Sequence, residues 1–200
     1  MSKTYERVAD HPIDPMFLAR WSPRAFAQQL ISESELMSIL EAARWAPSAF
    51  NGQPWRFVYA RRDTPSWEGF VDLLVPRNRD WAQHASALVF IASKTTILPH
   101  GADHPAPSSS HTLDAGASSA YLGLQAHLMG WCVHGMAGFD RDRAATELRL
   151  PHDHVIQAVY AIGRKGDATS LPGPLRARER PSSRMPLSEI AFEGAFRQDS

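Results

Sequence analysis

The first stretch of the sequence that could do chemistry is "ARWSPRAF", residues 19–26, in which Arg20, Ser22 and Arg24 alternate along the chain. In an extended segment, these three side chains point the same way. Two guanidinium groups around a hydroxyl suit a phosphate or another polar anion, because each arginine presents several N–H donors in a fixed fork. An ordinary solvated surface turn is the alternative interpretation, and the motif alone leaves both open.

A second polar cluster lies in "PSAFNGQPW", residues 47–55, where prolines stiffen both ends and leave backbone groups outside regular structure. Between them, Ser48, Asn51 and Gln53 offer side-chain donors and acceptors. A polar shelf that begins at Pro47 in this way suits a flat heteroaromatic ligand with a polar edge. The alternative is a plain loop at the C-terminal end of a helix.

A third candidate is "CVHGMAGF", in which Gly135 and Gly138 bracket Met136 and Ala137. Glycines let the backbone come close to a ligand, although such pairs usually only make turns. Residues 166–196 add four arginines that are typical of a solvated charge run unless one folds back to meet an anion, namely Arg176, Arg178, Arg180 and Arg184.

Other kinds of site find little support. The histidines lack a closely placed set of carboxylate or cysteine ligands, so no metal site is predicted. The sequence also lacks a G-x-S-x-G elbow, a phosphate-cradling G-x-x-x-x-G-K-[ST] loop and a G-x-G-x-x-G fingerprint.

The composition is that of an ordinary globular protein. Its 200 residues are 44% apolar and 21% charged, which predicts one domain over residues 1–200 with a substantial core. Because 21 basic residues balance 21 acidic ones, no long-range field would gather nucleic acid or an anionic membrane surface. A single cysteine, Cys132, and the absence of a signal-peptide or membrane-span pattern predict a cytoplasmic protein.

The elements that must position these residues follow from hydrophobic spacing. A capping box of Ser32 and Glu35 starts a helix that Pro47 ends. Aromatic, β-branched and fully apolar runs predict strands over 55–60, 87–93 and 155–163. We further expect a mobile loop over 99–110, a small-residue helix over 112–130 that must be covered all round, a turn over 134–140, and a helix over 141–150 that Asp140 caps.

These elements alternate irregularly, without a repeated strand–glycine loop–helix unit. That pattern favours an α+β fold around a mixed or antiparallel sheet. The C-terminal tail keeps four large apolar residues that predict docking on another surface such as a partner chain, namely Leu187, Ile190, Phe192 and Phe196.

The order and spacing of these motifs resemble the FMN-dependent nitroreductase family over residues from about 17 to 190. The family's "R-R/H-S-x-R/K-x-F" run corresponds to Arg20–Phe26, with Trp21 at its second position instead of arginine or histidine. The family's "E-A-A-R-x-A-P-S-x-x-N-x-Q-P-W-x-F" run corresponds to Glu41–Phe57 at every fixed position. "NRDWAQHASALVFIAS", "DAGASSAYLGLQAHLMGW", "GMAGFD" and "SSRMPLSEI" are similar to further landmarks of the family.

The resemblance implies a nitroreductase-like fold, with a central, mostly antiparallel mixed sheet flanked by helices in an intertwined homodimer. It implies two FMN sites at the dimer interface, each built from both chains. The tail, about residues 165–200, would then wrap the partner subunit, and the helix over 112–130 would form the central contact.

The resemblance also implies a role for each matching residue. Arg20 and Ser22, with the backbone of Trp21, would hold the FMN phosphate and ribityl chain, and Arg184 would be the second phosphate clamp. Where some members carry a lysine, this chain has Ser182, and the candidates to replace that lysine are Arg164, Lys165 and Arg180.

The remaining matches concern the flavin ring. Arg24 would lie near its pyrimidine edge as a cation that favours the reduced ring, and Asn78 would touch the same ring. The backbone of Gly135, Met136, Ala137 and Gly138 would line the flavin near the atom that accepts hydride. The junction residues Pro47, Ser48, Asn51 and Gln53 would face the flavin bound mainly by the other subunit.

The implied activity is a ping-pong hydride transfer from NADH or NADPH, through FMN, to a nitroaromatic, a quinone or a similar flat electrophile. No protein side chain is assigned as catalytic, because the flavin carries the chemistry. Reductive dehalogenation, flavin breakdown, another dehydrogenation on the same fold, a flavin-binding protein without turnover and a relative without cofactor remain alternatives. The choice between NADH and NADPH also stays open.

Overall fold

The computed structural model describes residues 7–196, so residues 1–6 and 197–200 of the predicted domain and tail lie outside the described residues. Within the described range, a four-stranded sheet has the order β1-β2-β6-β5, and every neighbouring pair is antiparallel. Its strands are β1 (Trp55–Arg61), β2 (Ala87–Lys94), β5 (Cys132–Met136) and β6 (His154–Gly163). A separate hairpin joins β3 (Thr96–Ile97) to β4 (Ala106–Pro107).

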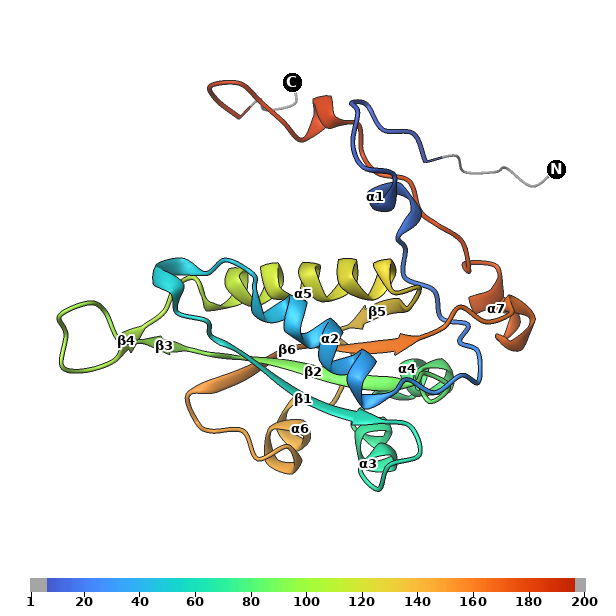
Figure 1. Ribbon diagram of the computed structural model, residues 1–200, viewed down its shortest axis with the longest axis horizontal. Coiled ribbons are helices and arrows are strands. Elements are labelled where there is room, and N and C mark those ends of the chain that lie inside the picture. The colour runs from blue at the N-terminus through green and yellow to red at the C-terminus, as the bar shows by residue number, and fades with distance from the viewer. Residues whose placement is uncertain (1–6, 197–200) are drawn as a thin grey trace.

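Helices cover both faces of this sheet (Figure 1). One face carries α2 (Glu33–Arg44) and α5 (His111–Leu128), and the other carries α3 (Trp67–Asp72), α4 (Pro76–Ala82) and α6 (Arg141–Glu147). Shorter elements are α1 (Pro15–Ala19), α7 (Gly173–Arg176) and the 3-10 turns η1 (Ala49–Asn51), η2 (Ala168–Ser170) and η3 (Leu187–Glu189). Because every neighbouring pair of strands is antiparallel, this arrangement of helices and sheet confirms the predicted α+β class.

Strand β2 explains why both faces need helices. Its residues alternate between two core clusters, with Leu88 and Phe90 facing α3, α4 and α6, and Val89 and Ile91 facing α2 and α5. All four side chains are fully buried. Because burial of each such side chain contributes about 1.5–3 kcal/mol, this central strand stabilises both layers at once. The prediction of a fully buried strand is confirmed.

Local signals in the sequence place most element ends correctly. The Ser32 hydroxyl accepts a hydrogen bond from the amide of Glu35 at 3.2 Å, and the Glu35 carboxylate accepts one from the amide of Ser32 at 3.0 Å. This reciprocal pair confirms the capping box at the start of α2. Asp140 caps α6 by accepting from the amide of Arg143 at 3.1 Å.

Two loop predictions are wrong in part. Residues 134–136 of the predicted turn belong to β5, and β4 lies inside the predicted loop over 99–110. Gly135 pairs with Tyr160 of β6, and a Cβ at position 135 would lie 2.8 Å from Cε1 of that tyrosine. The glycine therefore makes room for a ring within the sheet instead of reversing the chain.

A single chain does not cover the small-residue helix all round, so the predicted complete cover would need a second subunit. One side of α5 packs against the sheet and α2, through residues such as Leu122 and Ala126. The opposite side leaves Leu113, Tyr121 and Leu128 exposed. Within the described chain, other elements therefore cover only one side of α5.

Residues 7–20 and 182–196 form two arms that run side by side away from the body of the molecule (Figure 1). Arg7 joins the arms, because its Nε donates to the carbonyl of Ser182 at 2.9 Å and its Nη1 to that of Arg20 at 2.7 Å. Further out, the carboxylate of Asp10 accepts from the amide of Leu187 at 2.7 Å. The bases of the two arms are therefore held together at the edge of the sheet.

Over residues 7–196, none of the helices combines the length and apolarity that crossing a membrane requires.

Candidate functional site

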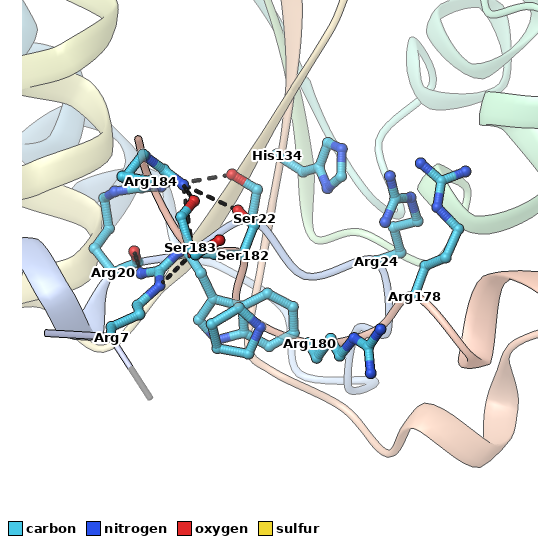
Figure 2. A pocket seen from close by; sticks show the side chains of 12 residues that line it. Arg7, Arg20, Ser22, Arg24, His134, Arg178, Arg180, Ser182, Ser183 and Arg184 are labelled. Carbon is cyan, nitrogen blue, oxygen red and sulfur yellow. Dashed lines mark hydrogen bonds between the residues drawn. The ribbon is translucent and has the colours of Figure 1, made fainter. Parts of the chain in front are cut away.

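A cavity of about 450 Å³ opens where the two arms meet the sheet (Figure 2). Among the described residues that line it, six are arginines and none is acidic: Arg7, Arg20, Arg24, Arg178, Arg180 and Arg184. The hydroxyls of Ser22, Ser182 and Ser183 and the ring of His134 complete the polar lining, beside Trp21 and Pro181. Such a surplus of guanidinium donors suits an anionic ligand.

One end of the cavity is formed by Arg7, Arg20 and Arg184, which we name the arm cluster. Nη1 of Arg184 donates to Oγ of Ser182 and to the carbonyl of Ser183, both at 2.9 Å, while Nη1 of Arg20 lies 3.5 Å from Oγ of Ser22. Burial lowers the pKa of Arg20, and the neighbouring charge of Arg184 lowers it further. These like charges repel one another without an anion between them, so the cluster is suited to a phosphate.

At the other end, Arg24 meets Arg178, as Figure 2 shows. Burial lowers the pKa of the half-buried Arg24, the Arg178 charge lowers it further, and the carboxylate of Glu179 opposes both effects. Oε1 of Glu179 accepts hydrogen bonds from the backbone amides of Arg24 at 2.7 Å and of Ala25 at 2.9 Å. This carboxylate ties the C-terminal segment to the chain that carries Arg24.

Replacing Glu179 with alanine is expected to release this connection. Two hydrogen bonds to a charged acceptor would be lost, each contributing about 1.5–3 kcal/mol. Limited trypsin digestion should then cut faster among the arginines after residue 175. The matched control is Glu189→Ala, since Glu189 lies on the exposed arm. Equal digestion rates for the two variants would contradict the role given to Glu179.

His134 enters the cavity from β5. Its ring packs on Trp81 with 4.6 Å between ring centroids, and its Nδ1 lies 3.1 Å from the carbonyl oxygen of Pro23. Burial lowers the pKa of His134, and the Arg24 charge lowers it further, against hydrogen bonds to the carbonyls of Pro23 and Ser22. The ring is therefore neutral at pH 7 and donates from Nδ1 to Pro23, which fixes the segment between Ser22 and Arg24.

The third candidate segment lies next to this strand. Nδ2 of Asn78 donates to the carbonyl of Gly138 at 2.9 Å, and a Cβ at position 138 would lie 2.7 Å from that nitrogen. Met136 is buried in the core, whereas Gly135 and Ala137 are exposed. Asn78 and the segment from Gly135 to Gly138 are thus brought together, but they do not line the arginine cavity.

The junction after α2 lies apart from the arginine cavity within one chain. Gln53 lines a separate groove with Glu41 and Arg44, and Pro47, Ser48 and Asn51 line none of the cavities described for residues 7–196. The backbone here is strained, since Phe50, Asn51 and Gln53 have φ values of 51°, 52° and 44°. Non-glycine residues rarely adopt this left-handed region.

Two hydrogen bonds hold this strained junction in place. Oγ of Ser48 accepts from the amide of Gln53 at 3.0 Å, and the carboxylate of Asp114 in α5 accepts from the amide of Ala49 at 3.2 Å. Asp114 is only 7% exposed and also accepts from Oγ of Ser110 at 3.0 Å. The buried carboxylate therefore links the junction to the central helix.

Replacing Asp114 with alanine is expected to lower the free energy of unfolding by about 1–3 kcal/mol, because the amide of Ala49 would lose its partner. Urea unfolding followed by circular dichroism measures this change. Hydrogen exchange should also rise at residues 48–53. Ser110→Ala removes only the second partner of the carboxylate, so it should leave exchange in the junction nearly unchanged. Unaltered exchange in Asp114→Ala would contradict the linking role.

Several residues in or beside the cavity were not predicted from the sequence. Arg7 and His134 line the cavity, and Glu179 supports its wall at Arg24, through contacts between distant parts of the chain, such as the 155 positions between Arg24 and Glu179. The sequence indicates Arg178 only as part of a charge run. Its alternation with Arg180, like that of Arg20 with Ser22 and Arg24, is the one local signal for this second face of the cavity. Among residues 7–196, no three histidine, cysteine, aspartate or glutamate side chains gather to hold a metal.

Comparison with known proteins agrees with this geometry. Residues 18–164 match the nitroreductase family. A solved structure described as that of an oxidoreductase containing FMN is 45% identical, with a TM-score of 0.93 over 100% of both chains. An uncharacterised 15.4 kDa protein of Mycolicibacterium smegmatis is 32% identical over 70% of this chain and 97% of its own length. An NADH dehydrogenase of Thermus thermophilus is 27% identical over 88% of this chain and 92% of its own length.

The family match covers most of the chain. The fold and the match together define an α+β protein of the oxidoreductase class, and the chain belongs to the nitroreductase family.

Proposed function

We propose that this chain is an FMN-dependent oxidoreductase that passes a hydride from NADH or NADPH, through FMN, to a nitroaromatic, a quinone or a similar flat electrophile. The observation that carries the proposal is the cavity of about 450 Å³ with six arginines and no acidic residue among its described lining. The FMN named in the description of the 45% identical structure supports it, as does the NADH dehydrogenase name of the Thermus relative.

The residues present fit the cofactor's charged end. Arg20, Ser22 and Arg184 would hold the phosphate, with the backbone of Trp21 beside them and Arg7 closing the arm cluster. Each charge-assisted hydrogen bond would contribute about 1.5–3 kcal/mol, so a few suffice to hold FMN without a covalent link. When bound, FMN would supply the hydride chemistry that no side chain here provides.

Protein groups beyond the phosphate site would orient the ring. Arg24 would meet the pyrimidine edge, and the neutral His134 would keep Ser22 and Arg24 in place through its hydrogen bond to Pro23. Asn78 and the backbone from Gly135 to Gly138, which lie outside the arginine cavity, would line the part of the ring that extends beyond it. Their mutual hydrogen bond gives this wall a defined shape.

A homodimer is part of the proposal. The exposed side of α5, with Leu113, Tyr121 and Leu128, supports a central contact between two copies of the helix. The arm that carries the exposed Leu187 and Ile190 would extend over the partner as the wrapping tail of residues 165–200. In such a dimer, Pro47, Ser48, Asn51 and Gln53 would meet the flavin of the other subunit, which accounts for their distance from the cavity of their own chain.

The compartment is also proposed. The single cysteine, Cys132, supports a reducing environment, and we propose the cytoplasm.

A visible spectrum of the purified protein under anaerobic conditions tests the proposal. We expect a yellow protein that NADH or NADPH bleaches, and whose colour a quinone or nitroaromatic restores. Parallel double-reciprocal lines should follow from ping-pong kinetics, and light scattering should give the mass of two chains. A yellow protein that neither nicotinamide bleaches would instead be a flavin-binding protein without turnover. A colourless protein that takes up no added FMN would contradict the proposal.

A further inference from the structure

The cavity holds more positive charge than one phosphate requires. An FMN phosphate carries about −1.5 to −2 charges at pH 7. The arm cluster of Arg7, Arg20 and Arg184 matches that charge with three guanidinium groups. Figure 2 shows Arg24 and Arg178 at the opposite end of the same cavity, on the far side of Ser22 and His134. This second pair needs its own explanation.

The described residues offset the positive charge at this pair only in part, through the nearby carboxylate of Glu179. Over residues 7–196, the guanidinium groups of Arg24 and Arg178 make no salt bridge, and Arg24 packs 5.9 Å from the ring of Trp81. The adjacent carboxylate of Glu179 uses one oxygen on the backbone amides of Arg24 and Ala25. Two like charges held at one wall of a cavity are unfavourable until an anion arrives between them.

The ligand that the proposed function places here becomes anionic during its own reaction. A hydride carries two electrons and one proton, so a neutral flavin ring that accepts it gains one negative charge. The oxidised ring lacks that charge. A cation pair at the ring end of the cavity therefore favours the reduced state over the oxidised state, whereas the arm cluster interacts with the phosphate of both.

We propose that Arg178 is a second flavin-tuning cation, which acts with Arg24 to stabilise the negative charge that FMN gains on reduction. The inference rests on the proposed function, because it requires FMN in this cavity. Arg178 lies on an exposed segment just after α7. Its substitution therefore leaves the core intact, and the variant should fold.

The test is an anaerobic redox titration of the bound flavin, together with a titration of apoprotein with oxidised FMN. For Arg178→Gln we expect unchanged affinity for oxidised FMN and about a tenfold loss in affinity for reduced FMN, the size of one partly screened charge contact. Tenfold corresponds to a midpoint potential lower by about 30 mV for a two-electron couple. Arg178→Lys should retain most of the potential, since it keeps the charge.

Arg176→Gln is the matched control from the same segment. The guanidinium of Arg176 donates to the carbonyls of Thr169 at 2.8 Å and Leu171 at 3.1 Å and does not line the cavity. This variant should keep the wild-type potential.

Three results would overturn the inference. An unchanged potential in Arg178→Gln would show that Arg178 does not act on the ring. A changed preference for NADPH over NADH in that variant would not alter this conclusion. A loss of affinity for oxidised FMN without a change in potential would place Arg178 at the phosphate instead. A wild-type protein that binds no FMN would remove the basis of the inference along with the proposed function, and its spectrum would reveal this before any variant is made.

Discussion

Alanine at both Arg20 and Arg184 is expected to weaken FMN binding by about 10²- to 10⁴-fold. Each side chain would lose a charge-assisted contact with the phosphate that contributes about 1.5–3 kcal/mol, and 1.4 kcal/mol corresponds to a factor of ten. Both residues lie at the arm cluster, where Arg184 is positioned by Ser182 and Ser183, and Arg20 by its approach to Ser22. Quenching of flavin fluorescence on titration of apoprotein measures the change.

Arg176→Ala is the control for this pair, because it removes one arginine from the same tail without touching the cavity. It should bind FMN as the wild type does. The loss in the double variant should also shrink as salt is added, since ions screen the charge that the wild type uses. A double variant that stays yellow through gel filtration would show that the phosphate lies elsewhere.

The elements that could be predicted are those whose signal is local. The capping box of Ser32 and Glu35, the proline that follows α2 and the apolar run of β2 each act within a few residues, and each gives an element close to its expected bounds. Helices α3 and α4 were missed because six and seven residues carry less than two full helical periods. Strand β5 was not predicted because glycine is as common in turns as at sites of tight packing. Here Gly135 makes room for the ring of Tyr160.

The residues of the candidate site also differ in whether a local signal in the sequence predicts them. The alternation of Arg20, Ser22 and Arg24 is local, and the structure does bring these three residues to one cavity. The contacts of Arg7 depend on how the two arms meet, and those of Glu179 depend on how the C-terminal segment returns to the chain that carries Arg24. Spacing along the chain says nothing about such contacts, so they emerge only in the folded structure.

Trp81 is the residue through which the core supports this site. It is 2% exposed, belongs to the core beneath α4 and packs on Phe26 with 6.1 Å between ring centroids. On its other side, it supports the ring of His134 at 4.6 Å and the guanidinium of Arg24 at 5.9 Å. Its large ring therefore connects the packing of the sheet to the far end of the cavity.

Replacing Trp81 with alanine is expected to lower the free energy of unfolding by about 3–5 kcal/mol, the usual cost of deleting a buried tryptophan. Urea unfolding measures that loss. Phe70→Ala is the control, because Phe70 lies in the same core but packs on Phe90, whereas Trp81 packs on His134 and Arg24. Both variants should be destabilised. At a temperature where both remain folded, only Trp81→Ala should also bind FMN more weakly, since His134 and Arg24 would lose the surface that holds them. Equal FMN affinities in the two variants would show that Trp81 stabilises the core without supporting FMN binding.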